Sequence, residues 1–271
     1  MDIDGTLVLV GAGKMGAALL NGWIADGLAP HKIAIFDPAP LPAIAALARE
    51  KHIRLNPAIE TITDAAATIL AIKPQMMGEV LPAYLPLRQP GNVLISIAAG
   101  KPVAFFEAIF GADTPIIRAM PNTPAAIGRG MSVLFANPSV SAPQKQLSHT
   151  LLSAVGNIAW IEDEGLMDPV TAVSGSGPAY VFLLVEALAQ AGHNAGLDAE
   201  LAYQLAATTV SGAGEMIAQS AEPAATLREN VTSPGGTTAA ALEILMGKDG
   251  LPALLTRAVA AATERSKELA R

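Results

Sequence analysis

The spacing of hydrophobic positions changes near residue 162, and this change divides the chain into two parts. Before it, short apolar runs rich in β-forming residues alternate with helical patterns, as in 14–25, 41–51 and 142–155. The runs that predict strands are 6–10, 32–36, 53–55, 67–72, 92–98, 115–120, 131–135 and 158–161. The spacing after residue 162 is helical throughout, with helices predicted at 166–173, 178–192, 199–219, 238–247 and 251–269. The pattern predicts an α/β domain over 1–162, with a mostly parallel doubly wound sheet, and an all-α domain over 163–271.

A glycine motif follows the first apolar run directly. Gly11, Gly13 and Gly16 have the spacing G-x-G-x-x-G, with a predicted strand before them and a helix after them. In this context the glycines allow a tight turn, a close approach to a pyrophosphate and close packing of helix on strand. The predicted cofactor contacts are Gly11, Ala12, Gly13, Lys14, Met15 and Gly16. A glycine-rich turn without a nucleotide is the alternative.

An acidic residue, Asp37, ends the second predicted strand. It lies about twenty residues beyond the last motif glycine, where a carboxylate binds the ribose 2′-hydroxyl. Pro38 and Pro40 follow, and no arginine is present there to bind a 2′-phosphate. A carboxylate about 4 Å from that phosphate costs roughly 1–4 kcal/mol per unit charge. Asp37 therefore favours NADH over NADPH, unless it only opens a turn before Pro38.

Other candidate residues lie where predicted strands end, the edge at which open α/β sheets bind ligands. Lys73 precedes Pro74, and it is either a neighbour of cofactor or substrate or a solvated lysine. Ala98 begins a run of small residues that would let a nicotinamide ring come close. Asn122, in a stiff Pro-Asn-Thr-Pro loop, offers both a donor and an acceptor.

Two stretches of small residues adjoin helices in the second part. Val173–Tyr180 contains Ser174, Gly175 and Ser176 before Pro178, which predicts a loop opening a helix with free N–H groups. The stretch 227–238 interrupts the predicted helices, and within it 233–238 is a second run of small residues that opens a helix, with threonine hydroxyls that suit an N-cap. If both stretches face the cofactor, their N–H groups form a pocket for a small carboxylate. Two unrelated helix starts are the alternative.

Composition narrows the classes of partner. The net charge is −7, the pI is about 5.1 and no Lys/Arg cluster occurs, so a nucleic-acid partner is not expected. The absence of cysteine leaves no disulfide or thiolate metal site, and we expect no metal. The mean hydropathy of +0.41 is high, yet no apolar run approaches the roughly 18 uninterrupted residues of a membrane span. We expect a cytoplasmic homo-oligomer that does not bind membranes, with its excess apolar surface at subunit interfaces.

Six motifs, taken together, resemble the Δ1-pyrroline-5-carboxylate reductase family over nearly the whole chain. They are Val10–Gly16, Ala71-Ile72-Lys73-Pro74-Gln75, Ser96–Gly100, Arg118–Pro124, Val173–Tyr180 and Val231–Thr238. The first is shared by many dehydrogenases, whereas the last three in this order are specific. The resemblance implies a Rossmann domain, a helical domain that forms a homodimer, and often a ring of dimers. It also implies hydride transfer from NADH or NADPH to the imine carbon of pyrroline-5-carboxylate, giving L-proline.

The resemblance further implies roles for individual residues. The N–H groups of Gly236, Thr237 and Thr238 would bind the substrate carboxylate, with the Thr238 hydroxyl near the imine nitrogen and Asn230 as a further contact. Lys73, Pro74 and Ala98 would line the cofactor. Thr238 and Lys73 are the candidate catalytic residues; Ser174, Gly175 and Ser176 are candidate substrate contacts, and Ala71, Ile72 and Asn122 are candidate cofactor contacts. Many relatives carry Ser or Thr where Asp37 stands and favour NADPH, so the cofactor preference stays open.

Imine reduction needs a positioned hydride donor and a proton, but no covalent nucleophile. The four histidines lie outside every motif, so positioning and a hydroxyl or water are expected to suffice. A reductase of another cyclic imine stays open as an alternative. A β-hydroxyacid dehydrogenase is disfavoured, because enzymes of that class have a catalytic lysine in the helix after their glycine loop. The corresponding stretch here, 179–190, contains no lysine. A nucleotide-sensing interaction protein is disfavoured because a sensor needs no second pocket.

Overall fold

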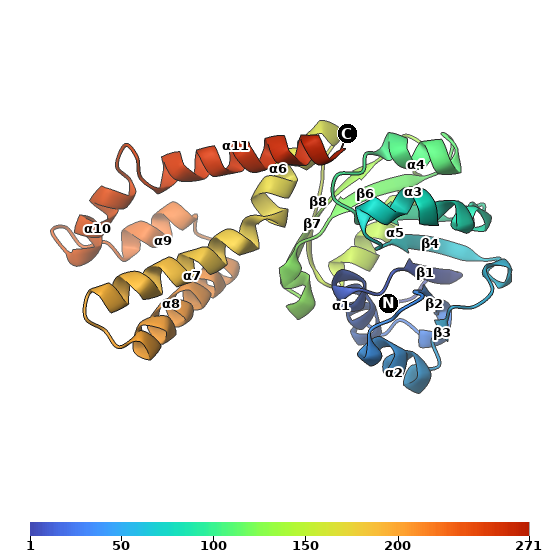
Figure 1. Cartoon of the computed structure of the whole chain (residues 1–271), viewed down its shortest axis with the longest axis horizontal. Helices are drawn as coiled ribbons and strands as arrows, with labels where there is room; N and C mark the ends of the chain where they lie inside the picture. The colour runs from blue at the N-terminus through green and yellow to red at the C-terminus, as the bar shows by residue number, and fades with distance from the viewer. Residues whose placement is uncertain (271) are drawn as a thin grey trace. The chain divides into compact units, whose positions relative to one another are not determined.

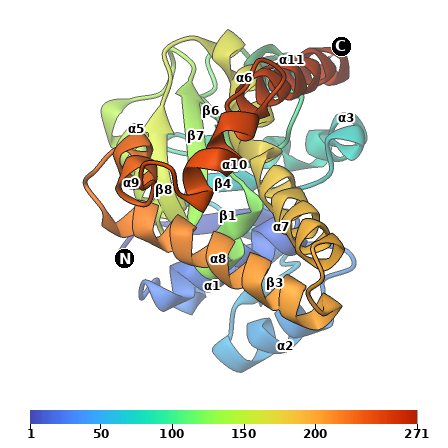
Figure 2. The ribbon, with the colours of Figure 1, turned by 90° about the vertical axis from the view of Figure 1, so that its left-hand side faces the viewer.

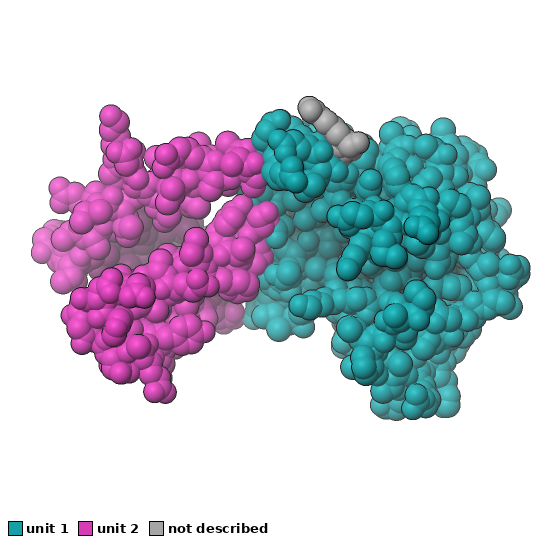
Figure 3. Space-filling model, in the orientation of Figure 1, with its two compact units in different colours: residues 1–175, 263–271 teal, residues 176–262 magenta. Residues whose placement is uncertain are grey.

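The protein forms two compact units in a computed structural model that describes residues 1–270. The first unit comprises residues 1–175 and 263–271, and the second comprises residues 176–262 (Figure 3). The predicted division at 162/163 follows the change in secondary structure, and as a domain boundary it stays a prediction.

An eight-stranded sheet forms the centre of the first unit, in the order β3-β2-β1-β4-β5-β6-β7-β8 (Figure 1). β6 and β7 pair antiparallel, and the other neighbouring strands pair parallel. The strands are β1 (Thr6–Val10), β2 (Ile33–Phe36), β3 (Arg54–Leu55), β4 (Ala65–Leu70), β5 (Val93–Ser96), β6 (Ile116–Met120), β7 (Gly130–Ala136) and β8 (Gly156–Trp160). The mostly parallel α/β prediction is confirmed.

Helices cover both faces of this sheet, because its central strands are apolar on both sides. In β1, Leu7 and Leu9 pack into one core and Val8 and Val10 into the other. Side chains of α1 (Lys14–Ala25), α2 (Pro42–Lys51) and α5 (Ala142–Ser153) complete the first core. Those of α3 (Met77–Val80), the 3₁₀ segment Leu81–Leu87 and α4 (Val103–Phe110) complete the second. The sheet is therefore doubly wound.

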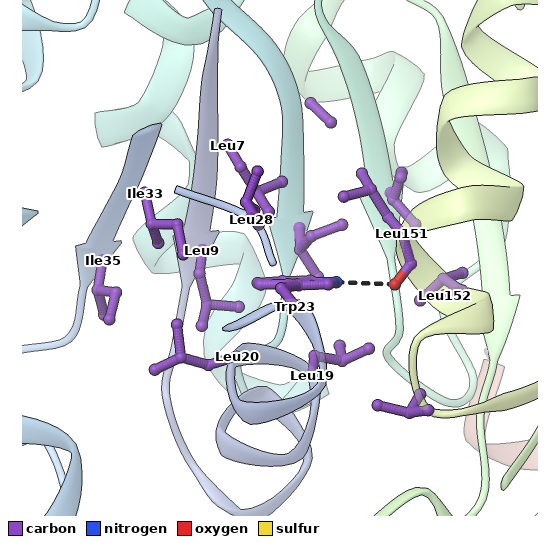
Figure 4. Close-up of a cluster of buried hydrophobic side chains, with 14 of the residues drawn as sticks. Leu7, Leu9, Leu19, Leu20, Trp23, Leu28, Ile33, Ile35, Leu151 and Leu152 are labelled. Atoms are coloured by element: carbon purple, nitrogen blue, oxygen red, sulfur yellow. Dashed lines mark hydrogen bonds between the residues drawn. The ribbon is translucent and has the colours of Figure 1, made fainter. Parts of the chain in front are cut away.

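Trp23 of α1 lies at the centre of the first core (Figure 4). It is completely buried, and its indole Nε1–H donates to the carbonyl oxygen of Leu151 at 2.7 Å. Leu151 stands in the last turn of α5, where helix carbonyls have no partner within the helix. The indole thus packs among leucines and satisfies a buried acceptor.

We expect Trp23→Phe to destabilise the protein by about 1–3 kcal/mol, because the Leu151 carbonyl is left buried without its donor. Urea unfolding followed by circular dichroism at fixed protein concentration measures this difference. Trp160→Phe is the matched control, because Trp160 is partly exposed. Equal losses in the two variants would contradict the role of the indole donor.

The second unit is helical. It contains α7 (Gly177–Asn194), α8 (Ala199–Gln219), α9 (Ala224–Asn230) and α10 (Thr237–Leu245), together with most of α11 (Leu251–Ala270). α7 and α8 lie side by side (Figure 2). Many large apolar side chains of these helices are exposed, including Phe182 and Leu183 at 61% each and Ile244 at 78%. Such an apolar surface marks a site of interaction with another protein surface or with a membrane.

The chain passes from the first unit to the second and later returns. α6 (Met167–Val170) and α7 lead outward, and the last residues of α11 belong again to the first unit. There Ser266 donates its hydroxyl to Asp168 of α6 at 2.6 Å. A Cβ on Gly100, whose φ is +70°, would stand 3.3 Å from the carbonyl oxygen of Leu269. The end of α11 therefore packs directly on the loop after β5.

Three helical segments differ from the sequence prediction. α4, the helical turns between 74 and 87, and α9 were not predicted from the apolar pattern. α4 is apolar on most of its surface, and 74–87 contains three prolines, so neither shows a clear helical period. Residues 227–230, expected to interrupt the helices, are instead the end of α9.

Candidate active site

The loops that follow β1, β2, β4 and β5 lie together at the carboxyl edge of the sheet. The Gly11 N–H donates to the Phe36 carbonyl at 2.8 Å, and the Ala71 N–H donates to the Val10 carbonyl at 2.7 Å. The Ile97 N–H donates to the Leu70 carbonyl at 3.2 Å. β1 lies between β2 and β4, where the strand order reverses, and open α/β sheets bind their ligands at such a point.

The three motif glycines have different surroundings. Gly11 has φ +91°, and a Cβ there would stand 2.8 Å from the carbonyl oxygen of Ala71. A Cβ on Gly16 would stand 2.4 Å from the carbonyl oxygen of Gly11. No described atom of the protein lies within 4 Å of a Cβ placed on Gly13. Gly11 and Gly16 are thus required by the protein's own packing, whereas Gly13 faces open space.

The N-terminus of α1 begins at this open position. Gly13 is the N-cap, and no side chain caps the helix. The first backbone N–H of the helix to bond within the chain is that of Ala17, which donates to Gly13 at 2.8 Å. Among residues 1–270, the N–H groups of Lys14, Met15 and Gly16 have no recorded protein acceptor. Unpaired N–H groups at the positive end of a helix dipole fit a pyrophosphate.

Asp37 is fixed at the end of β2 by hydrogen bonds to both carboxylate oxygens. The Ala12 N–H donates to Oδ2 at 2.8 Å, and the Ala39 N–H donates to Oδ1 at 2.9 Å. The side chain of Asn56 pairs with the backbone of Asp37, accepting at 2.8 Å and donating at 2.7 Å. The carboxylate therefore lies beside the glycine loop, as a ribose-binding acid should.

Sequence reasoning missed Asn56. The residue has φ +49°, a left-handed conformation in which asparagine is enriched among non-glycine residues. An asparagine directly after a short strand was the available signal.

Tyr84 lies on the same side of the sheet as Phe36, with its ring edge-on to the Phe36 ring. Burial, and then the charge of Asp37, raises the pKa of the Tyr84 hydroxyl, so this group stays neutral at physiological pH.

The remaining predicted cofactor residues lie at the neighbouring strand ends. β4 ends at Leu70 rather than at Ile72, and Lys73 is the extended N-cap of the 3₁₀ turn Pro74–Met76. Ile72 contacts the glycine loop, since its Cγ2 would lie 2.9 Å from a Cβ on Gly11. Lys73 is exposed, and Ala98 is buried beyond the end of β5. Their contacts with a cofactor stay predictions.

The stretch around Ser174 is not the loop that the sequence predicted. Thr171–Gly175 is a π-helical turn, and Ser176 continues with helical dihedrals into α7. The prediction of a loop with free N–H groups before Pro178 was therefore wrong. A proline in the first turn is typical of a helix start, but here it follows a wider helical turn instead.

Asn122 connects the end of β6 with this π-turn. Its Nδ2 donates to the carbonyl oxygen of Ser174 at 3.2 Å and lies 3.3 Å from the Ser174 hydroxyl. Its Oδ1 accepts from the N–H of Met131 at 2.8 Å. The structure brings two predicted site residues together, although the Asn122 amide is already occupied by protein groups.

The second stretch of small residues does precede a helix. α10 begins at Thr237 with Gly236 as N-cap, and no side chain caps it, so the expected threonine cap was wrong. Among the described residues, the N–H groups of Thr237 and Thr238 have no recorded acceptor, and the Thr238 hydroxyl has no recorded partner. Asn230 ends α9 and donates to Glu222 at 3.2 Å. Gly236–Thr238 belong to the second unit and Ser174 to the first, so the meeting of the two stretches stays a prediction.

An ion pair beneath the site was also missed. Arg118 of β6 is 5% exposed, and its Nη1 lies 3.0 Å from Oε1 of Glu164. The same oxygen accepts the N–H of Val103, the first residue of α4, at 2.8 Å. Arg118 stands in one of the quoted motifs, but Glu164 follows only as an acidic residue after β8. The carboxylate joins β6, α4 and the start of the helical segment.

The fold and the glycine loop together define a dinucleotide-dependent oxidoreductase with a helical second part. Residues 6–100 match the family described as NADP oxidoreductase, coenzyme F420-dependent. Residues 164–269 match the family described as pyrroline-5-carboxylate reductase dimerisation. A pyrroline-5-carboxylate reductase of Pseudomonas aeruginosa is 43% identical over 265 residues, covering 97% of this chain and 96% of that protein. The chain belongs to the pyrroline-5-carboxylate reductase family.

Solved structures agree with this assignment. A pyrroline-5-carboxylate reductase from Coxiella burnetii is 33% identical and superimposes with a TM-score of 0.92, over 99% of this chain and 100% of that one. The enzyme from Plasmodium falciparum, with NADP bound, is 32% identical with a TM-score of 0.81 over 98% of each chain. The predicted family, Rossmann fold and oxidoreductase class are confirmed.

The family match also bears on the exposed apolar helix. Residues 164–194 form a helical stretch long and apolar enough, by length and composition, to cross a membrane, and only 6% of its most apolar window is buried. This stretch lies inside the dimerisation domain. An exposed apolar helix fits a subunit interface as well as a membrane span. The match to a dimerisation family favours the subunit interface.

Proposed function

We propose that this protein catalyses the NAD(P)H-dependent reduction of 1-pyrroline-5-carboxylate to L-proline, the last step of proline biosynthesis. The observation that carries the proposal is the sequence similarity to pyrroline-5-carboxylate reductases over nearly the full length, with 43% identity to one of them. The glycine loop, whose open side fits a pyrophosphate, agrees with it. When bound, a reduced nicotinamide supplies a hydride to the imine carbon. The chain's own groups then have to hold the substrate carboxylate and provide a proton for the imine nitrogen.

The direct test follows the loss of NADH or NADPH absorbance on addition of pyrroline-5-carboxylate. The six-membered cyclic imine acid, run beside it, separates this function from that of a broader imine reductase. Equal turnover of both substrates would favour the broader class. Tight binding of NADH without turnover of either imine would favour a nucleotide sensor.

The uncapped start of α10 is the proposed carboxylate site. The unpaired N–H groups of Thr237 and Thr238 stand at the N-terminal end of a nine-residue helix, whose dipole favours an anion. The N–H of Gly236, the third proposed contact, donates to the Ser233 carbonyl at 3.0 Å and would exchange that acceptor for the carboxylate. Within this arrangement the Thr238 hydroxyl is the group that reaches the imine nitrogen. Lys73, Asn230 and the Ser174–Ser176 stretch complete the proposed surroundings of the substrate.

We expect Thr238→Ala to lower kcat roughly tenfold to a hundredfold, toward the low end of general acid–base contributions. The hydroxyl would orient or deliver the proton for the imine nitrogen, and alanine has no group to replace it. Steady-state kinetics with pyrroline-5-carboxylate measure the loss. Thr238→Ser should recover most of it, and Thr237→Ala serves as the control because only the backbone of Thr237 is assigned. Unchanged kinetics in Thr238→Ala would remove the hydroxyl from the mechanism.

The cofactor preference rests on Asp37. Its carboxylate is held beside the glycine loop by two N–H donors, and no cation is recorded as its partner within residues 1–270. A 2′-phosphate at this place would meet a negative charge, so we expect a lower KM for NADH than for NADPH. Asp37→Ser should narrow the difference. A clear preference of the unmodified protein for NADPH would refute this assignment.

The proposed assembly is a cytoplasmic homodimer formed through the helical unit, with a ring of dimers as the larger form. The exposed apolar side chains of α7 and α10 support a subunit interface there. Light scattering on a sizing column at micromolar concentration gives the mass, and a monomer would contradict the proposal.

A further inference from the structure

The helical segment 164–194 opens with a 3₁₀ turn and is then interrupted by one wider turn before α7. Residues Thr171–Gly175 form a π-turn, with Pro178 placed three residues beyond it. A proline has no N–H for the carbonyl four residues earlier, and its ring repels that carbonyl. That carbonyl is the one of Ser174. The proline therefore explains why the Ser174 oxygen has no partner within the helix and needs another donor.

Asn122 supplies that donor. Its Nδ2 donates to the Ser174 carbonyl oxygen at 3.2 Å and reaches the Ser174 hydroxyl at 3.3 Å. The other end of the amide, Oδ1, accepts the N–H of Met131 at 2.8 Å, which fixes the orientation of the side chain. Every contact in this set lies within the first unit.

The neighbouring residue of β6 packs on the same turn. A Cβ on Gly175 would stand 2.4 Å from Cε of Met120, so this side chain lies directly against the glycine backbone. The end of β6 thus holds the π-turn by one hydrogen-bonded side chain and one apolar side chain. Single π-turns within α-helices are frequent at functional sites, because they aim backbone and side-chain groups out of the regular spiral.

We propose that Asn122 is a positioning residue that keeps the π-turn open by replacing the hydrogen bond that Pro178 cannot make. In this role it fixes Ser174 and Gly175 in the arrangement that the substrate meets, and it does not contact the nicotinamide cofactor. This inference rests on the proposed function, which gives Ser174–Ser176 to the substrate.

Asn122→Asp isolates the donor. Aspartate keeps an oxygen for the Met131 N–H but has no N–H for the Ser174 carbonyl. We expect kcat/KM for pyrroline-5-carboxylate to fall roughly tenfold to a hundredfold, as for a misplaced positioning group, with KM for the cofactor unchanged. Asn157→Asp, at an exposed site on β8, controls for the added charge.

A second substitution separates positioning from stability. In Asn122→Asp combined with Pro178→Ala, the new N–H at 178 can donate to the Ser174 carbonyl and close a regular α-turn. We expect this double variant to regain the melting temperature that Asn122→Asp alone loses. Its kcat/KM should stay low, because the π-turn is lost. Recovery of both quantities would show that Asn122 is only structural and would overturn the proposal.

The remaining outcomes are also distinct. A rise in cofactor KM in Asn122→Asp, or unchanged imine kinetics beside an active unmodified protein, overturns this inference alone. An unmodified protein that reduces no imine with either cofactor overturns the proposed function, and this role falls with it. If Asn122→Asp alone does not fold, the double variant with Pro178→Ala still tests the proposal, because the new N–H at 178 satisfies the Ser174 carbonyl; kcat/KM equal to that of the unmodified protein would overturn the proposal.

Discussion

Replacing Gly13 with alanine should leave the protein folded but weaken dinucleotide binding, whereas Gly16→Ala should destabilise the fold. A methyl group on Gly13 meets no described protein atom within 4 Å, so the apo protein accommodates it. It would meet the pyrophosphate instead, and overpacking of about 1–3 kcal/mol weakens binding by roughly one to two decades. Gly16→Ala would place its methyl 2.4 Å from the Gly11 carbonyl, so helix and strand must separate.

Thermal melting and fluorescence titration with NADH distinguish the two effects. For Gly13→Ala we expect an unchanged melting temperature in the absence of NADH and a raised Kd. For Gly16→Ala we expect a lowered melting temperature with or without NADH. Gly78→Ala is the matched control, since Gly78 is also surrounded by open space but lies in α3, away from the glycine loop. Undiminished NADH affinity in Gly13→Ala would place the pyrophosphate elsewhere.

Glu164→Ala should reduce the free energy of unfolding by about 3 kcal/mol, at the low end of the cost of breaking a buried ion pair. The Arg118 side chain is 6% exposed and would keep its charge without the Glu164 carboxylate. The first N–H of α4 would lose its acceptor as well. The expected loss lies at the low end because the Glu164 side chain is 27% exposed, so water can solvate part of the Arg118 charge that remains.

Urea unfolding at fixed protein concentration measures this loss. Asp113→Ala removes the partner of Arg88 in an exposed pair and should cost less than about 1 kcal/mol. The double variant Arg118→Met with Glu164→Leu should recover most of the stability, because no unpaired charge stays buried. If Glu164→Ala behaves like Asp113→Ala, the pair contributes no more than a surface contact.

The strands were predictable because most are short apolar runs, and β1, β2, β3, β6 and β7 are each followed directly by a glycine, proline or polar residue. β1 and the glycine loop matched the sequence residue for residue, since the spacing of Gly11, Gly13 and Gly16 has one steric explanation. β4 was predicted two residues too late, at 67–72 instead of Ala65–Leu70, because Ala71 and Ile72 are apolar yet belong to the loop. Apolar character alone does not show where pairing stops.

The helical residues near Ser174 were harder to predict. Serine, glycine and proline in succession are typical of a loop, and the pattern holds no sign that a distant asparagine would hold them in a helix. The contact between Asn122 and Ser174 joins residues 52 positions apart, which local propensity does not record. Two other contacts are long-range in the same sense: the ion pair of Arg118 with Glu164, and the two hydrogen bonds between the Asn56 side chain and the Asp37 backbone. Local pattern does not predict these contacts for this reason.

The two crossings of the chain make residues 176–262 an insertion within the first unit, because both of their ends continue into it. A protease that cuts the exposed segment between α8 and α9 would leave the C-terminal fragment held to the first unit only by non-covalent contacts of the end of α11, such as the hydrogen bond of Ser266 to Asp168. The helical unit is therefore joined to the first unit at both of its ends. Exchange with a relative at residues 176 and 262 would transplant the interface and the α10 site together, while the nucleotide half stays unaltered.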